Sequence, residues 1–284
     1  MISMVGKSIR RWWALFTIPT LAAFVVGFVV PFVMGIWLSL CRFTTVTDAS
    51  FIGLGNYSQA LSDTEFWHSM LYTLAFTVVT TVIINVLGFA VAYMLTKAIR
   101  GANIFRSVFF MPNLIGGIIL GYIWLLLLNG VLGRWGRSIT YSGVYGFWGM
   151  VMLYCWQQIG YMMIIYIAGL QSLPGDVIEA ASVDGANGRQ RLFHITLPLM
   201  MPSITVCTFL TMTNGFKMFD QNLALTNGAP SNTSELLALN IYRTFYGRTG
   251  FEGVGQAKAV IFFVIVAIIA VIQNRLTTSK EVAA

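Results

Sequence analysis

Long apolar segments, each followed by a short polar stretch, recur from one end of this sequence to the other. The bilayer interior holds no water to hydrogen-bond peptide groups, so a segment that crosses it must form a helix with internal backbone bonds. About twenty apolar residues suffice for one crossing. The sequence therefore predicts an all-α polytopic membrane protein with six transmembrane helices, at about residues 12–40, 70–95, 107–128, 147–170, 199–225 and 257–276.

The composition agrees with a membrane location. Of 284 residues, 57% are hydrophobic and only 10% are charged, which is too apolar for a soluble domain of this length. The net charge of +7 could suggest nucleic acid as a partner, but the basic residues gather at the ends of apolar segments and form no continuous face. We therefore expect lipid and not nucleic acid around the chain. The first apolar run is too long for a signal-peptide core, so it is predicted to be a retained helix.

The distribution of Lys and Arg predicts the orientation in the membrane. Ten lie on the side that holds both termini: Lys7, Arg10, Arg11, Lys97, Arg100, Arg106, Arg189, Arg191, Arg275 and Lys280. Six lie on the opposite side: Arg42, Arg134, Arg137, Arg243, Arg248 and Lys258. By the positive-inside rule, both termini are cytoplasmic. Residues 41–69 and 226–256 are then extracytoplasmic loops, and residues 172–195 form a cytoplasmic loop.

That cytoplasmic loop carries signs of folded structure. Pro174 can open a short helix because the amide that it lacks would have no partner there. Gly185 and Gly188 can turn the chain into a second short helix, which is predicted to carry Arg189 and Arg191 and to end before Pro198. The loop is thus predicted to be a helix-turn-helix knuckle at the membrane surface. A structured connector without further function is the alternative interpretation.

The knuckle also carries a spaced motif, Glu179-Ala180-Ala181, then Gly185, then Ile195 and Leu197-Pro198. This motif resembles the signature loop of permease subunits of binding-protein-dependent ABC importers. The resemblance implies a type I (MetI-like) permease fold over residues 1–284 and a coupling helix that docks on a separate ATPase subunit. The residues to which it assigns coupling are Glu179, Ala180, Ala181, Asp184, Gly185, Arg189 and Arg191.

The same resemblance implies the partners and the location. The partners are a second homologous permease, two ATPase subunits and an extracytoplasmic binding protein, in the cytoplasmic membrane of a bacterium. ATP and Mg²⁺ would be held by the ATPase subunits, so this chain is expected to bind no cofactor and to catalyse no reaction. The residues themselves agree, because the odd number of cysteines and the two scattered histidines indicate neither a disulfide framework nor a metal site.

Polar residues within the fourth and fifth segments predict a polar interior, since such residues avoid hydrocarbon. They are Trp156, Gln157, Gln158 and Tyr161 in the fourth segment and Thr211, Asn214, Lys217, Asp220 and Gln221 in the fifth. If the fifth segment is a continuous helix, Thr211, Asn214, Lys217 and Gln221 share one stripe. Amides, hydroxyls and aromatic faces suit a sugar. The alternative interpretation is that these residues hold helices together and that Lys217 and Asp220 form a structural ion pair.

A second stretch strengthens the carbohydrate interpretation. Phe219-Asp220 and Thr226-Asn227-Gly228-Ala229-Pro230 are similar to a segment of carbohydrate-importing permeases, of the type that includes the larger maltose-importer permease. Ala229 stands where that family has a second glycine. The resemblance implies that Trp156, Tyr161, Thr211, Gly215 and Met218 occupy lining positions and that the solute is a carbohydrate, with an oligosaccharide as the favoured class.

Two other functional classes are open to a chain of this kind. A secondary transporter or channel could use Lys217 and Asp220 as an ion or proton site. An intramembrane enzyme would need a nucleophile with a base at depth, but His68 and His194 are both predicted to lie outside the membrane core. Dependence of uptake on ATP, and not on a proton gradient, separates the importer from the first of these.

Overall fold

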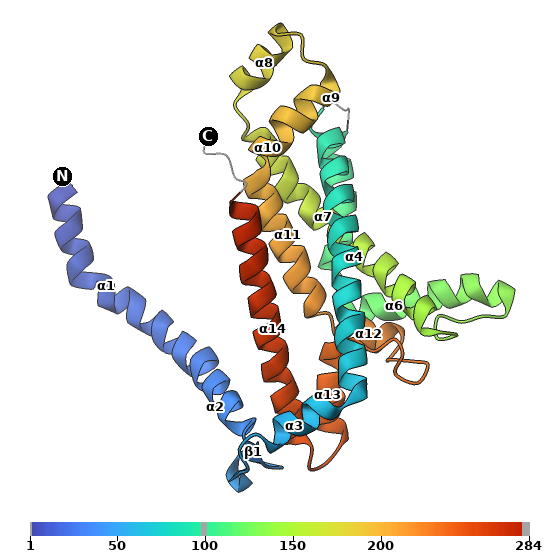
Figure 1. Cartoon of the computed structure of the whole chain (residues 1–284). Helices are drawn as coiled ribbons and strands as arrows, with labels where there is room; N and C mark the ends of the chain where they lie inside the picture. The colour runs from blue at the N-terminus through green and yellow to red at the C-terminus, as the bar shows by residue number, and fades with distance from the viewer. Residues whose placement is uncertain (1, 98–100, 280–284) are drawn as a thin grey trace. The chain divides into compact units, whose positions relative to one another are not determined.

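The computed structural model describes residues 2–97 and 101–279, with side chains from Trp12 onward (Figure 1). Arg100 and Lys280, and the side chains of Lys7, Arg10 and Arg11, which the orientation count used, lie outside the described part. The chain forms two compact units. The first unit comprises the residues up to Asp63 together with Ile241–Phe262, and the second comprises Thr64–Asn240 and the chain from Phe263 onward.

The first unit begins with a long helical segment and a small hairpin. Its elements are α1 (Ile2–Phe24), a π-helical turn (Val25–Val29), α2 (Val30–Leu38), strands β1 (Cys41–Arg42) and β2 (Ser50–Phe51), a 3₁₀ turn (Val46–Asp48) and α3 (Gly55–Ser62). Pro31 explains the π-helical turn, because a proline ring crowds the carbonyl one turn before it. The backbone adapts by bonding the Val30 N–H to the Val25 carbonyl, five residues back. The strands pair antiparallel, with Cys41 opposite Phe51.

The second unit is a helical bundle with several breaks. Its elements are α4 (Thr64–Leu95), α5 (Ala102–Phe110), a 3₁₀ turn (Met111–Leu114), α6 (Gly117–Leu132), a 3₁₀ turn (Gly133–Trp135), α7 (Gly143–Gln171), α8 (Gly175–Val183), α9 (Gly188–Arg191), a π-helical turn (Leu192–Thr196), α10 (Leu197–Leu199), α11 (Met201–Phe216) and α12 (Asp220–Leu225). Two further helices, α13 (Leu237–Gly247) and α14 (Glu252–Thr278), each have residues in both units.

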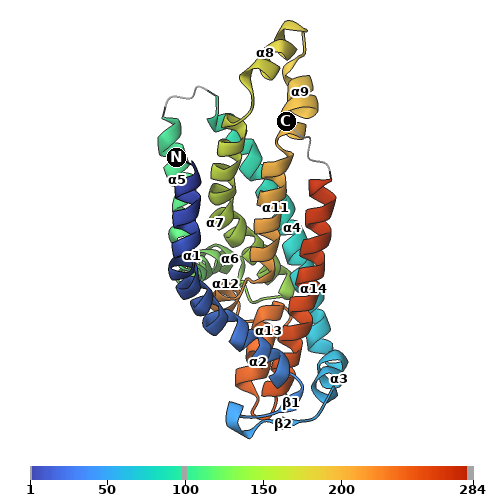
Figure 2. The same cartoon turned by 90° about the vertical axis from the view of Figure 1, so that its left-hand side faces the viewer.

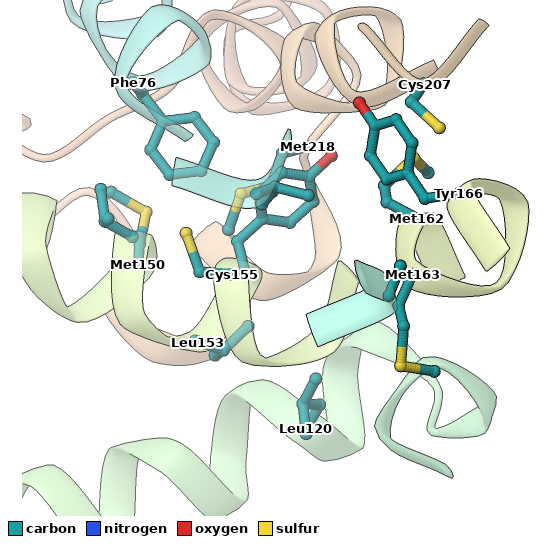
Figure 3. Close-up of a cluster of buried hydrophobic side chains, with 14 of the residues drawn as sticks. Phe76, Leu120, Met150, Leu153, Cys155, Met162, Met163, Tyr166, Cys207 and Met218 are labelled. Atoms are coloured by element: carbon teal, nitrogen blue, oxygen red, sulfur yellow. The ribbon is translucent and has the colours of Figure 1, made fainter. Parts of the chain in front are cut away.

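The core of the second unit lies where α4 packs against α7 and α11. Its buried side chains are rich in sulfur, with Met150, Met162 and Met163 on α7 near Phe76 and Tyr166 (Figure 3). Small residues let these helices approach closely. Gly160 of α7, for example, faces the backbone of Phe109, where any Cβ would overlap the carbonyl oxygen. The packing therefore depends on close backbone contact as well as on apolar side chains.

The described residues contain five single helices that are long and apolar enough to span a membrane, and six if one bent pair counts as one span. Four of the six predicted segments coincide with such helices, at Trp12–Leu38, Thr64–Leu95, Gly143–Gln171 and Glu252–Thr278. The third begins at Gly117 and not near Ser107, because Pro112 and an extended Ile115–Gly116 separate it from α5.

The prediction of one continuous fifth helix over residues 199–225 is wrong. The bent pair is Gly188–Leu199 and Met201–Phe216, which meet at 68°. At the other end, α11 stops at Phe216, and α12 begins only at Asp220. Asn222 helps to hold α12 apart from α11, because its buried side chain donates to the Ser234 carbonyl (2.8 Å) and accepts from the Leu236 N–H (2.9 Å).

Within the first unit, Lys258, which the orientation count assigned to the side opposite the termini, is buried in α14. Its Nζ lies 2.7 Å from Asp63 Oδ2 and 2.8 Å from Thr244 Oγ1. The carboxylate of Asp48, in contrast, is exposed and accepts hydrogen bonds from Thr44 and Thr45, which lower its pKa to about 2. Both predicted extracytoplasmic loops contain helical structure, in α3, α13 and the first turns of α4 and α14.

Candidate functional site

The predicted knuckle is present and lies beyond the ends of α7 and α11, where α8 and α9 project from the second unit (Figures 1 and 2, yellow). Both views place it away from α12, which lies toward the other end of the same unit. Asp176 stands in the first turn of α8, where the helix dipole favours an anion. The loop thus folds as two short helices and not as a slack connector.

The turn out of α8 satisfies its last carbonyls in a specific way. Gly185 has φ +79°, a conformation that strains residues with a Cβ. This geometry lets the Ala186 N–H reach the Ala181 carbonyl (2.9 Å) and the Gly185 N–H reach the Ser182 carbonyl (3.2 Å). The two bonds together form a Schellman motif, which fixes the direction in which the chain leaves the helix.

The start of α9 is fixed as well. The Asn187 side chain accepts from the Gln190 N–H (2.9 Å), and the Gln190 side chain accepts from the Asn187 N–H (2.8 Å). This reciprocal capping box satisfies two amides that the helix cannot pair internally. Arg191 then reaches back to α8 and donates to the Ser182 hydroxyl (2.6 Å). The two helices are therefore joined by side-chain bonds as well as by the turn.

The surface of the knuckle differs in part from the prediction. Glu179, Ala180, Asp184, Gly185 and Arg189 are exposed, as a docking surface requires. Ala181 is buried, so it supports the helix and offers no surface to a partner. Val183 is 83% exposed and adds an apolar side chain that we did not include in the predicted surface.

The prediction that the second helix of the knuckle ends before Pro198 is wrong. The helical chain continues through a π-helical turn to Leu199, where the Leu197 N–H bonds to the Leu192 carbonyl. As at Pro31, the wider turn accommodates the proline ring without ending the helix.

The break between α11 and α12 changes the interpretation of the polar interior. α11 ends at Phe216 and Lys217 is its C-cap, so Gln221 does not share a helical stripe with Thr211, Asn214 and Lys217. Within the described residues, Lys217 and Asp220 form no ion pair, and both are exposed. The ion or proton site proposed as an alternative therefore loses the pairing on which it depended.

Thr211 is buried in a network that the sequence did not indicate. Its hydroxyl accepts from Asn85 Nδ2 (2.8 Å) and donates to the Cys207 carbonyl (2.8 Å). The Tyr166 hydroxyl donates to Asn85 Oδ1 (2.6 Å), so the network joins α4, α7 and α11. This geometry favours the interhelical role that we left open for Thr211. A lone Asn in the middle of an apolar segment was the signal that could have identified Asn85.

The remaining predicted lining residues differ in how far they are buried. Gly215 is buried against Thr77, and Met218 is buried in the cluster near Phe76 (Figure 3). Trp156 is 45% exposed and makes an edge contact with Trp124, with ring centroids 5.7 Å apart. Tyr161 and Asn214 are half-buried, and Gln157 is buried.

The second unit is thus a bundle of membrane-length helices with breaks, from which a capped helical knuckle projects. The fold is that of a chain in a crystal structure of a bacterial ABC transporter involved in the import of the acidic polysaccharide alginate. The TM-score is 0.80 at 19% identity, covering 97% of this chain and 99% of the other. Residues 84–280 match the family model for the inner membrane component of binding-protein-dependent transport systems, and the chain belongs to that family.

Curated relatives match almost the full length. The chain is 44% identical over 283 residues to the "Probable starch degradation products transport system permease protein AmyD" of Thermoanaerobacterium thermosulfurigenes, with 95% of each chain covered. It is 30% identical to the multiple sugar-binding transport system permease protein MsmF of Streptococcus mutans, covering 98% of this chain and 99% of MsmF. The family and the type I fold predicted from the Glu179–Pro198 motif are thus confirmed. The chain is a non-catalytic, multi-pass inner membrane subunit, and ATP hydrolysis belongs to a separate subunit.

Proposed function

We propose that this chain is a permease subunit through which a carbohydrate enters the cell after delivery by an extracytoplasmic binding protein. The favoured class of solute is an oligosaccharide. The names of its relatives, which refer to starch degradation products and to multiple sugars, support the solute class. The exposed indole of Trp156 and the half-buried Asn214 offer the stacking face and the amide that a sugar ring uses.

In this proposal the knuckle transmits the work of ATP binding to the bundle. Two permeases form the pathway, and each presents a knuckle to one of two ATPase subunits. Closure of the ATPase pair on ATP moves the knuckles and opens the pathway to the outside, and hydrolysis reverses the movement. In the orientation predicted from the Lys and Arg distribution, both termini and the knuckle face the cytoplasm, which is the side where ATP is available. The observation that carries the proposal is the construction of the knuckle, since a movement is transmitted only through a part that does not deform.

The test is charge reversal at the exposed Glu179. In proteoliposomes that contain the complete transporter, Glu179→Lys should insert normally but abolish uptake and the stimulation of ATP hydrolysis by the binding protein. The charge available to a cationic group of the ATPase is then reversed, and buried charge-assisted contacts of this kind cost several kcal/mol when broken. The control is Gln171→Lys, which introduces the same cationic side chain at the exposed end of α7 and should leave uptake close to wild type; it changes the charge by one unit, against two at Glu179. Full ATP-driven uptake by Glu179→Lys would exclude this role of Glu179.

A further inference from the structure

Two backbone interruptions lie in the membrane segments of the second unit. In the first, Ile115 (ψ 129°) and Gly116 (ψ 140°) are extended between the Met111–Leu114 turn and α6. In the second, the chain leaves the helix at Lys217 and resumes it at Asp220, with Phe219 at φ −128°. A break in a membrane helix exposes backbone groups that the bilayer cannot satisfy, so protein side chains must do so.

The segments that follow the two interruptions pack directly on each other. Gly117 faces α12 so closely that a Cβ would lie 2.7 Å from the Asp220 Cβ and 3.1 Å from the Gln221 Cδ. One turn later, a Cβ on Gly121 would lie 2.6 Å from the Ala224 Cβ. These two glycines, four residues apart on one face of α6, thus bring α6 against α12. Because the glycines let α6 approach α12 this closely, we expect α6 and α12 to move as one body.

One side chain of α7 joins both interruptions. Gln157 is 5% exposed; its Nε2 donates to the Ile115 carbonyl (3.2 Å), and its Oε1 accepts from Gln221 Nε2 (2.9 Å). The carbonyl can only accept, so the amide must turn its nitrogen toward Ile115 and its oxygen toward Gln221. Both ends of the amide are therefore engaged by the protein, and neither is available to a solute in this conformation.

We propose that Gln157 is a positioning residue that holds the α6–α12 pair against α7 in this conformation and releases it when the pathway changes sides. We call the three groups, Gln157, Gln221 and the Ile115 carbonyl, the Gln157 latch. The inference rests on the proposed transport function for its consequence, but its geometry does not depend on which solute is carried. It replaces the earlier expectation that Gln157 lines the pathway.

Interhelical hydrogen bonds in membrane proteins contribute about 0.6 kcal/mol each on average. Replacing Gln157 by Met keeps the length of the side chain and removes both bonds, so it should raise the ratio of released to latched molecules about eightfold, or about 1.2 kcal/mol. Gln221→Met removes one bond and should raise the ratio about threefold. The double variant should match Gln157→Met, because Gln221 has then no latch bond left to lose.

The neighbouring residue provides a matched control. Gln158 is also buried on α7, but its Oε1 has no hydrogen-bond partner among the described residues. Gln158→Met is the same chemical change one position away, and it should leave the ratio unchanged.

The ratio can be measured without transport, by electron–electron distance spectroscopy on the complete transporter in lipid. Spin labels replace the exposed side chains of Val131, which lies late in α6, and Trp148, which lies early in α7. The populations of the two distances are compared without nucleotide and with a non-hydrolysable ATP analogue. We expect the ratio of released to latched molecules to be highest in Gln157→Met and lower in Gln221→Met. It should be lowest, and equal, in Gln158→Met and the wild type.

A bond that only stabilises the fold would lower the yield of folded protein and leave the ratio of conformations unchanged. Unchanged ratios in both Gln157→Met and Gln221→Met, or an equal shift in Gln158→Met, would therefore overturn the latch. If Gln157→Met does not fold, the threefold shift in Gln221→Met decides the question. Failure of the transport proposal would be seen separately, as the absence of ATP-driven sugar uptake by the wild type.

Discussion

Gly185 offers a direct test of whether the shape of the knuckle matters. A Cβ at this position would meet nothing within 4 Å, so Gly185→Ala creates no clash. Its backbone, however, has φ +79°, which costs a residue with a Cβ about 1–2 kcal/mol. The substitution therefore acts on the turn after α8 through backbone strain alone. An energy of this size corresponds to a change of about 5–30-fold in the population of the native turn.

Gly188→Ala is the matched control in the same loop. A Cβ on Gly188 also meets nothing within 4 Å, and the residue is the first of α9 with no positive φ. Alanine favours helix over glycine by about 0.8–1.0 kcal/mol, so this change should leave the knuckle intact or stabilise it.

Two measurements separate structure from coupling. Hydrogen exchange at the amides of Gly185 and Ala186, which close the turn, should accelerate about 5–30-fold in Gly185→Ala and not in Gly188→Ala. ATP-driven uptake and binding-protein-stimulated ATP hydrolysis should fall in the first variant only. Unchanged exchange in Gly185→Ala would refute the strain argument. Faster exchange with normal uptake would refute the dependence of coupling on a rigid knuckle.

Two further predictions concern the stability of the purified protein and are checked by thermal unfolding. Lys258→Met should destabilise by about 3 kcal/mol because it removes the ammonium that lies 2.7 Å from the Asp63 carboxylate, and adding Asp63→Asn should recover most of the loss. A double variant no more stable than the single one would contradict this. Gly160→Ala should lower the free energy of unfolding by about 3 kcal/mol, because its methyl would overlap the Phe109 backbone. Gly130→Ala, whose Cβ would meet nothing within 4 Å, should be neutral or stabilising. Equal unfolding midpoints in the two variants would contradict the packing.

The parts of the fold that the sequence predicted are those set by local chemistry. Apolar length placed four spans within a few residues of their observed bounds. In the knuckle, Pro174 and Gly185 fixed both ends of α8, because a missing amide and a positive φ are properties of single residues. These features need no knowledge of what packs on them.

The second interruption could not be predicted because its cause is tertiary. Residues 216–219 contain neither proline nor glycine, and their composition suits a continuing helix. The helix stops because α12 is held elsewhere, by the bonds of Asn222 to the loop that follows and by the close contact of Ala224 with Gly121. The error about Lys217 and Asp220 has the same origin, since a spacing of three residues pairs side chains only within a continuous helix.

The residues predicted to line the interior now fall into those already engaged by other protein groups and those still accessible to a solute. Thr211 is bonded to Asn85, Gln157 to two partners, and Gly215 and Met218 are covered by other side chains. A buried polar group whose bonds are satisfied gains little from a solute, because it must first give up those bonds. We therefore infer that solute contacts in this conformation are to be sought at Trp156, which is exposed, and at Asn214 and Lys217 near the end of α11. On this argument, Asn214→Leu should weaken sugar uptake with no effect on the latch ratio, whereas Gln157→Met should change both.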